Sequence, residues 1–119
     1  MKLIIAGSRT LSPSIPDISG YIDSIPSRPL MTDLEVICGG VDGVDKCGAD
    51  WAEYCHHPVR RFNAQCKKYG PKRAGLVRNF YMTDYADALL LIWDGKSKGS
   101  AHMKRCMLKL GKPVWEVVI

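Results

Sequence analysis

Residues 88–93 read Ala-Leu-Leu-Leu-Ile-Trp, an almost unbroken apolar run that stops at Asp94-Gly95. A run of this length is typical of a β-strand that is buried on both faces. Such burial occurs where helices cover both sides of a parallel sheet, so this one segment already favours an α/β protein over an all-α or all-β one.

Strand and helix patterns alternate along the rest of the chain. Short apolar runs indicate four further strands, at residues 2–6, 34–38, 58–62 and 114–119. Apolar residues at helical spacing indicate three helices, at residues 45–54, 71–85 and 100–110. The Pro- and Ser-rich stretch 12–29 is expected to be a crossover with one short helix near 17–24, and 63–70 to be a polar loop. This order predicts a parallel sheet with right-handed crossovers.

Two of the expected helices carry an apolar face. In helix 45–54 the face consists of Cys47, Ala49, Trp51, Ala52 and the following Cys55. In helix 71–85 it consists of Leu76, Val77, Phe80, Tyr81 and Tyr85. The second face leaves two interpretations open, since it can complete the core or contact a second copy of the chain. The third helix is expected to end at Gly111, with Pro113 as a stop.

Composition indicates one globular domain that spans residues 1–119. The chain has 119 residues, of which 46% are hydrophobic and 24% charged. No run approaches the roughly 20 apolar residues that a membrane-spanning helix needs. The apolar start breaks at Gly7, too early for a secretory signal. A cytoplasmic protein with no membrane association is therefore expected.

The formal net charge of +5 indicates attraction to anions. Basic residues are scattered along the chain, whereas sequence-independent nucleic-acid binding needs them gathered on one face. The sequence does not show whether they gather. Solubility together with attraction of a small anionic ligand is the favoured interpretation.

Five cysteines, with no CxxC pair, lack the spacing of a zinc site or a disulfide framework. They are expected to be reduced and mostly buried. Cys55-His56-His57 is expected to form the end of a helix and a loop, because adjacent residues rarely point at one ion. We therefore expect no metal and no cofactor.

Ligands of parallel α/β sheets bind beyond the C-terminal ends of the strands. Three segments of this chain follow expected strands: Gly7-Ser8-Arg9, residues 39–45 and residues 93–100. In the first segment a hydroxyl and a guanidinium would grip a phosphate or carboxylate. The other interpretation of the same residues is an ordinary polar turn.

The second segment has Gly39, Gly40 and Gly43, which allow a tight turn and close approach to a ligand. Their spacing does not match GxGxxG, and the chain has no GKS or GKT element, so a standard dinucleotide site or ATPase phosphate loop is disfavoured. Asp42 and Asp45 would accept hydrogen bonds from ribose hydroxyls. Alternatively, Asp45 caps the helix that follows.

The third segment contains the best phosphate candidate. Ser97, Lys98, Gly99 and Ser100 bring two hydroxyls, a lysine and open backbone N–H groups to the start of a helix. Ser97 as a simple N-cap is the alternative. Trp93 would stack on a base or belong to the core.

Arg78 and Asn79 lie in the preceding helix. They line a pocket in one interpretation and an exposed helical face in the other.

Five ordered motifs resemble those of a known family. They are Met1-Lys-Leu-Ile-Ile-Ala-Gly-Ser-Arg9, Cys38-Gly-Gly-Val-Asp-Gly-Val-Asp45, Ala74-Gly-Leu-Val-Arg-Asn79 with Met82, Ala86-Asp87, and Trp93-Asp-Gly-Lys-Ser-Lys-Gly-Ser100. Over essentially its whole length the chain resembles the YspA-like branch of the SLOG superfamily, relatives of the LOG phosphoribohydrolases and of DprA. Members are common in bacteria and phages. The resemblance implies a single Rossmann-like domain, a three-layer sandwich with a mainly parallel five-stranded sheet.

The same resemblance implies a pocket for a nucleotide or an ADP-ribose-like ligand. By position, the ligand-binding residues would be Gly7, Ser8, Arg9, Gly39, Gly40, Asp42, Gly43, Asp45, Arg78, Asn79, Trp93, Asp94, Ser97, Gly99 and Ser100. Ser100 stands where LOG enzymes usually have threonine. Met103 stands at the position of their catalytic glutamate, and a thioether cannot replace that carboxylate. Related LOG proteins self-associate, so the resemblance also implies a homodimer.

Three functions follow from these residues. The favoured one is a sensor, carrier or sequestering module that binds a nucleotide-type ligand. The alternative is a hydrolase of an N-glycosidic or phosphate bond, with Asp42, Asp45 or Asp94 as the carboxylate and Arg78 as a further catalytic candidate. The third is DprA-like nucleic-acid binding.

Overall fold

A sheet of five parallel strands forms the centre of the protein in the computed structural model, which describes residues 1–26 and 33–119. The strands lie in the order β3-β2-β1-β4-β5. Their bounds are β1 Lys2–Gly7, β2 Glu35–Cys38, β3 Val59–Arg61, β4 Ala88–Trp93 and β5 Val114–Val118. Every pairing between neighbours is parallel. The predicted fold class, a Rossmann-like α/β sandwich, is confirmed.

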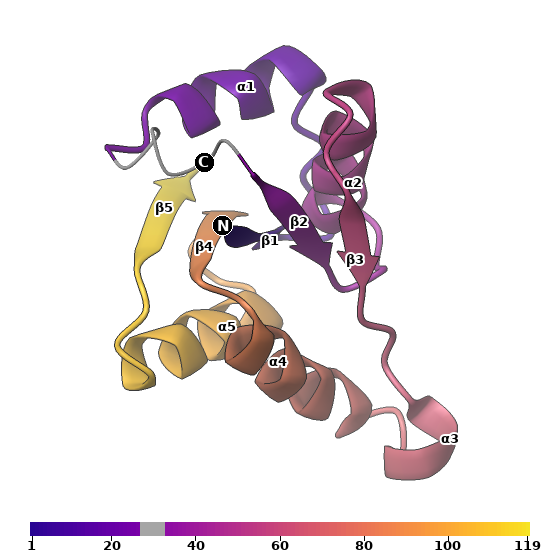
Figure 1. Ribbon diagram of the computed structural model, residues 1–119. Helices are drawn as coiled ribbons and strands as arrows, with labels where there is room; N and C mark the ends of the chain where they lie inside the picture. The colour runs from indigo at the N-terminus through magenta and orange to yellow at the C-terminus, as the bar shows by residue number, and fades with distance from the viewer. Residues whose placement is uncertain (27–32) are drawn as a thin grey trace.

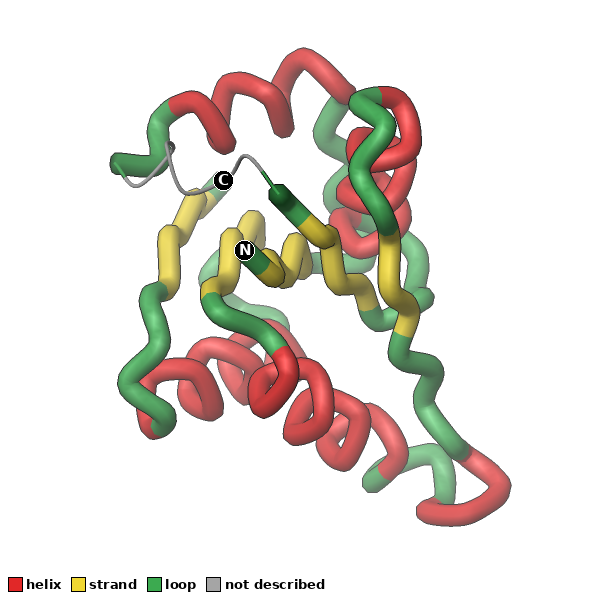
Figure 2. Tube along the Cα trace, viewed as in Figure 1, coloured by secondary structure: helices red, strands yellow, loops and turns green. Residues whose placement is uncertain are grey.

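Helices cover both faces of this sheet. Their bounds are α1 Ile15–Asp23, α2 Val44–Tyr54, α3 Cys66–Tyr69, α4 Ala74–Tyr85 and α5 Lys98–Lys109. Figure 1 shows α1 and α2 on one side of the strands and α4 and α5 on the other. Figure 2 shows the same three layers, with α3 away from the sheet beyond the end of β3. The arrangement follows from strands that must be buried on both faces.

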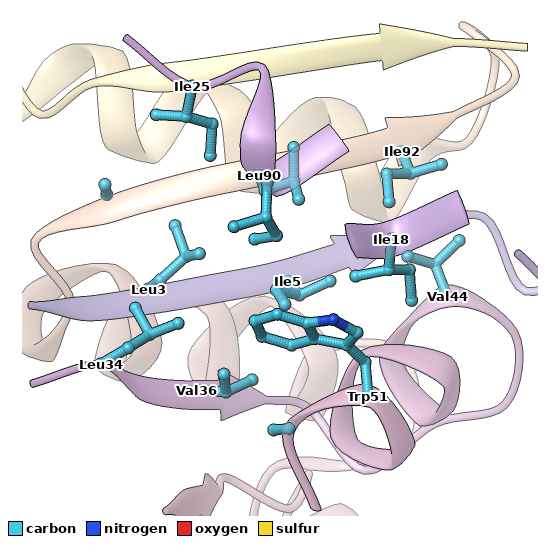
Figure 3. Packing of buried hydrophobic residues seen from close by; sticks show 13 residues of the cluster. Leu3, Ile5, Ile18, Ile25, Leu34, Val36, Val44, Trp51, Leu90 and Ile92 are labelled. Carbon is cyan, nitrogen blue, oxygen red and sulfur yellow. The ribbon is translucent and has the colours of Figure 1, made fainter. Parts of the chain in front are cut away.

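The alternating side chains of β1 divide the core into two parts. Leu3 and Ile5 face the α1 and α2 layer, where they pack with Ile18 and Trp51 (Figure 3). The indole Nε1 of Trp51 donates a hydrogen bond to Ser19 Oγ over 2.9 Å, which joins α2 to α1. The apolar face predicted for this helix is largely confirmed, since Ala49, Trp51 and Ala52 are buried, while Cys47 and Cys55 are half-buried.

Ile4 and Ala6 face the opposite layer. There they pack with Met82 of α4 and with Met103 and Met107 of α5. The position of β4 inside the sheet, between β1 and β5, explains the apolar run that distinguishes it in the sequence. All six of its residues are buried, as predicted.

Helix caps explain where the structure departs from the expected boundaries. α1 begins at Ile15 rather than near residue 17, because Ser14 and Asp17 form a capping box. Ser14 Oγ accepts a hydrogen bond from the Asp17 N–H over 3.1 Å, and Asp17 Oδ2 accepts one from the Ser14 N–H over 3.0 Å. α5 begins at Lys98 because Ser97 is its N-cap. Gly111 follows α5 with a φ of +71°, as expected for a helix stop. Residues 27–29 of the expected crossover lie outside the described residues.

The prediction of a loop at 63–70 is wrong in part. Residues Cys66–Tyr69 form the short helix α3, in which the Gly70 N–H donates to the Cys66 carbonyl over 2.8 Å. Gly70 then ends the helix with a φ of +80°. A single polar turn of this kind leaves no apolar periodicity in the sequence.

Only part of the apolar face predicted for α4 belongs to the core: Tyr85 is half-buried and packs against it, and Val77 is half-buried. The helix begins at Ala74 rather than residue 71, and Leu76, Phe80 and Tyr81 are exposed by 43%, 58% and 56%. The buried residues are instead Ala74, Asn79, Met82 and Thr83. The two polar ones are buried at low cost because both form hydrogen bonds, for example from Thr83 Oγ1 to the Asn79 carbonyl over 2.9 Å.

The five cysteines are free, but fewer of them are buried than expected. Cys38 and Cys106 are buried, Cys47 and Cys55 are half-buried, and Cys66 is exposed. Cys55 is the C-cap of α2, and His57 packs near Trp51 with ring centroids 5.3 Å apart. Within residues 1–26 and 33–119, no three His, Cys, Asp or Glu side chains gather to hold a metal ion. No helix in those ranges is long and apolar enough to cross a membrane.

Candidate functional site

A pocket of about 370 Å³ opens at the C-terminal ends of β1 and β4. The chain leaves β1 toward α1 on one face of the sheet and leaves β4 toward α5 on the other. The two loops therefore diverge, and a crevice forms between them. The residues that line it are Ala6, Gly7, Ser8, Arg9, Thr10, Val41, Asp45, Arg78, Asn79, Asp94, Ser97, Gly99, Ser100 and Met103.

The loop after β1 supplies one wall. Ser8 is 2% exposed; its N–H donates to the Ile92 carbonyl over 3.2 Å and its Oγ accepts from the Asp94 N–H over 3.1 Å. Gly7 permits this closeness, because a Cβ there would lie 1.6 Å from the Ile92 carbonyl oxygen. Ser8 thus holds the two loops together, and the exposed Arg9 beside it is the side chain that is free to reach a ligand.

The start of α5 supplies the opposite wall. Ser97, Gly99 and Ser100 line the pocket, with Ser97 Oγ accepting from the Ser100 N–H over 3.4 Å. The exposed Lys98 does not line it. Asp94 Oδ1 accepts from the N–H groups of Lys96 and Ser97 over 2.8 and 3.0 Å. Those hydrogen bonds lower the pKa of Asp94, which is therefore an ionised anchor of the loop.

Asp45 lies at the side of the pocket next to β2. It is 4% exposed and accepts a hydrogen bond at Oδ2 from the Gly39 N–H over 3.1 Å. Burial raises its pKa to about 6, even though the Arg78 guanidinium favours the charged form. The alternative of a helix cap is wrong, since Gly43 is the N-cap of α2 and no side chain caps it.

Other parts of the protein occupy the space next to Gly39 and Gly43 in the glycine-rich turn. A Cβ on Gly39 would lie 2.7 Å from Asp45 Oδ2 and 3.0 Å from Arg78 Cζ. Gly43 has a φ of +82° and lies against the backbone of Ser8 and Arg9. The predicted residues Gly39, Gly40, Asp42 and Gly43 do not line the pocket. Asp42 and Gly40 border a separate hollow of about 180 Å³.

Arg78 and Asn79 face inward, so the interpretation as an exposed helical face is wrong. Arg78 Nη1 donates to the Gly39 carbonyl over 3.2 Å, and its Nη2 donates to Asn79 Oδ1 over 3.1 Å. Asn79 Nδ2 donates to the Gly99 carbonyl over 3.4 Å and to His102 Nδ1 over 3.1 Å. These bonds connect α4 to the start of α5. Within the described chain, Arg78 Nε is buried without a hydrogen-bond partner.

Trp93 does not contribute to the pocket. It is 8% exposed in the core between the sheet and α5, and its Nε1 donates to Glu116 Oε2 over 2.6 Å. Lys104 Nζ lies 3.0 Å from Glu116 Oε1. The core alternative for Trp93 is confirmed, and a role as a platform for a base is not supported.

Sequence reasoning missed three kinds of lining residue. Thr10 extends the loop after β1, where a hydroxyl three residues beyond a strand end is a usable signal. Ala6 and Val41 carry no chemical signal that distinguishes them from core residues. Met103 was identified only as an aligned position, and it forms a buried part of the wall, 3% exposed.

Comparison with known proteins supports the fold. No family model matches this sequence, and no curated protein sequence matches it either. A solved structure, that of DNA processing protein A (DprA) from Streptococcus pneumoniae, is similar with a TM-score of 0.75 and 16% identity. The match covers 97% of this chain and 49% of the DprA chain, so this chain spans about half the length of that protein. At this identity the likeness is one of fold.

Proposed function

We propose that the protein binds a nucleotide or a nucleotide-derived ligand, ADP-ribose-like or a nucleoside phosphate, as a sensor, carrier or sequestering module. One observation carries the proposal: Arg9, the start of α5 and Arg78 border the same pocket of about 370 Å³. A pocket of this size is typical of small-molecule sites. The resemblance of the sequence to the SLOG superfamily supports the same ligand class.

A phosphate group would bind at the start of α5. The first-turn N–H groups of a helix have no intrahelical acceptor, and the helix dipole favours an anion there. The hydroxyls of Ser97 and Ser100 border this point, and Arg9 lies across the pocket from them. Arg78 places a positive charge on the inner wall next to the Asp45 carboxylate, although its Nη atoms already donate hydrogen bonds to Gly39 and Asn79.

The test is binding by the whole chain. Small molecules released from the purified protein are identified by mass spectrometry, and AMP and ADP-ribose are added in thermal-shift assays. Arg9→Ala and Ser100→Ala should each diminish the shift. Lys98→Ala is the matched control, because it removes a positive charge from the same region without touching the pocket. Equal shifts in all variants would refute the site.

Hydrolysis of a nucleotide is a second candidate, and Asp45 is the observation that favours it. Of the three candidate carboxylates, Asp45 and Asp94 border the pocket. Hydrogen bonds lower the pKa of Asp94, whereas burial raises the pKa of Asp45 to about 6, which suits proton transfer near neutral pH. The test is to incubate the protein for hours with nucleoside monophosphates, ADP-ribose and NAD. If the protein binds one of these compounds and leaves all of them intact, this activity is excluded.

Nucleic-acid binding is the third candidate, supported by the fold shared with a DNA processing protein. It predicts affinity for DNA that falls steeply as salt concentration rises, because phosphate contacts release counterions. The homodimer implied by the sequence resemblance is a further proposal. The exposed side chains of Leu76, Phe80 and Tyr81 on α4 are the surface that would supply its contact.

A further inference from the structure

A second cleft, of about 470 Å³, lies beside the pocket, where the edge strand β3 and the chain after it meet α4. Arg78 lines both cavities, so the cleft and the pocket lie on either side of this one side chain. The other residues that line the cleft are Arg60, Arg61, Phe62, Asn63, Gln65, Tyr81, Asp84 and Tyr85. None of them is used by the pocket at β1 and β4.

Arg60 is the most unusual member of this cleft. Its guanidinium lies over two aromatic rings, 5.2 Å from the Phe62 centroid and 4.7 Å from that of Tyr85. Within residues 1–26 and 33–119 it has no ion-pair partner. A guanidinium supported on one face by aromatic rings is fixed in orientation, and it keeps its other face for stacking and its N–H edge for an anion.

The remaining charges in the cleft favour an anion. Arg60 and Arg78 direct their charge at the cleft against one carboxylate, that of Asp84, whereas Arg61 only borders it. Arg61 also faces Glu53 at 3.5 Å, but both side chains are more than half exposed and such a pair is weak. Asn63 and Gln65 add amide groups that are able to pair with the polar edge of a base.

The cleft extends along α4, away from the pocket at β1 and β4. Arg78, Tyr81 and Tyr85 are spaced three and four residues apart, so they lie along one face of α4. At a rise of about 1.5 Å per residue, they cover roughly 10 Å from the shared arginine to the far end. A ligand held by a phosphate at α5 would reach Arg60 by passing Arg78, the side chain that borders both cavities.

We infer that this cleft is a second subsite, for an anionic group that bears an aromatic base, and that the site as a whole takes a ligand of dinucleotide size. The inference rests on the proposed function, because the first nucleotide unit is the one held in the pocket at β1 and β4. A small ligand is favoured over a polynucleotide because each cavity has the volume of a small-molecule site.

The test compares one nucleotide unit with two. Calorimetry on the full chain measures AMP and the dinucleotide pApA. The parent protein should bind pApA at least about tenfold more tightly than AMP. Arg60→Ala should remove that advantage and leave the affinity for AMP unchanged. Arg60→Lys keeps the charge but loses the planar group, so it should restore only part of the advantage. Arg105→Ala, a loss of an exposed arginine on α5, is the matched control and should change neither affinity.

Each contrary outcome has a distinct meaning. If AMP binds and pApA binds no more tightly, or if Arg60→Ala and Arg105→Ala weaken pApA equally, the second subsite is refuted while the proposed function stands. If neither probe binds, the second subsite is refuted, and the proposed function falls as well when ADP-ribose also gives no thermal shift. If an oligonucleotide of about 12 units binds far more tightly than pApA, with a steep dependence on salt, the occupant is a nucleic acid and the dinucleotide inference is overturned.

Discussion

Asp94, at the end of β4, donates its backbone N–H to the Oγ of Ser8, at the end of β1, over 3.1 Å. The two residues are 86 positions apart in the sequence, and the bond joins the two loops that form opposite walls of the pocket. The width of the pocket therefore depends on a side chain that is itself 2% exposed.

Replacement of Ser8 by alanine should lower the free energy of unfolding by about 1 kcal/mol, because the Asp94 N–H loses its acceptor in a partly buried place. Urea denaturation measures the change. Ser12→Ala, in the exposed part of the same connection, should change it by less than about 0.5 kcal/mol. Equal effects of the two substitutions would show that the bond between the loops contributes nothing.

The raised pKa of Asp45 predicts a pH dependence of stability. Its pKa is 3.8 ordinarily and about 6 in the folded protein, so the folded state binds a proton more tightly than the unfolded state. The contribution of this residue is therefore largest below about pH 4 and is lost as the pH rises toward 6. Denaturation of the parent and of Asp45→Asn across this range isolates the effect, because other groups titrate in both.

The parent should lose stability relative to Asp45→Asn as the pH rises from about 4 to about 6. Burial outweighs the attraction of Arg78 in raising the pKa, so the asparagine variant should be at least as stable as the parent above that range. A difference between the two proteins that does not vary with pH would contradict the assignment.

Gly39 should not tolerate a side chain. Gly39→Ala places a methyl group 2.7 Å from Asp45 Oδ2 and 3.0 Å from Arg78 Cζ, which forces both side chains to shift. A loss of about 1–3 kcal/mol in unfolding free energy is expected, with weaker binding of AMP. Gly75→Ala in α4 meets nothing within 4 Å and should be neutral or stabilising, which makes it the matched control.

Trp93 should matter for stability but not for binding. Trp93→Phe removes the donor to Glu116 and should lower the free energy of unfolding by about 2 kcal/mol, while the affinity for AMP stays the same. Calorimetry and urea denaturation measure the two effects separately. Glu116→Gln keeps an acceptor for the indole and should cost less. A large loss of AMP affinity in Trp93→Phe would contradict this prediction and show that Trp93 takes part in binding.

The sheet was the part most accessible to sequence reasoning. An apolar run such as that of β4 has few alternatives, and the rule for parallel sheets then selects the loops at Ser8 and Ser97 as neighbours. The environment of Gly39 could not be predicted from the sequence. Whether a glycine turn admits a ligand or a side chain of the same protein depends on contacts between α2 and α4, which local sequence does not encode.

The same limitation explains why the sequence left the role of the apolar face of α4 open. Phe80 and Tyr81 are as apolar as core residues, and only the hydrogen bonds of Asn79 and Thr83 make the opposite face suitable for burial. The second cleft also depends on distant contacts. Arg60 and Tyr85 are 25 positions apart in the sequence, and the folded sheet brings them together.

β3 has consequences for how the protein meets other chains. It is an edge strand of three residues, two of which are arginines. Successive side chains of a strand point to opposite faces, so Arg60 approaches Tyr85 of α4 while Arg61 approaches Glu53 of α2. A sixth strand added at this edge would lie against an arginine side chain on each face of the sheet. The short, doubly charged strand β3 therefore protects this edge of the sheet against edge-to-edge aggregation.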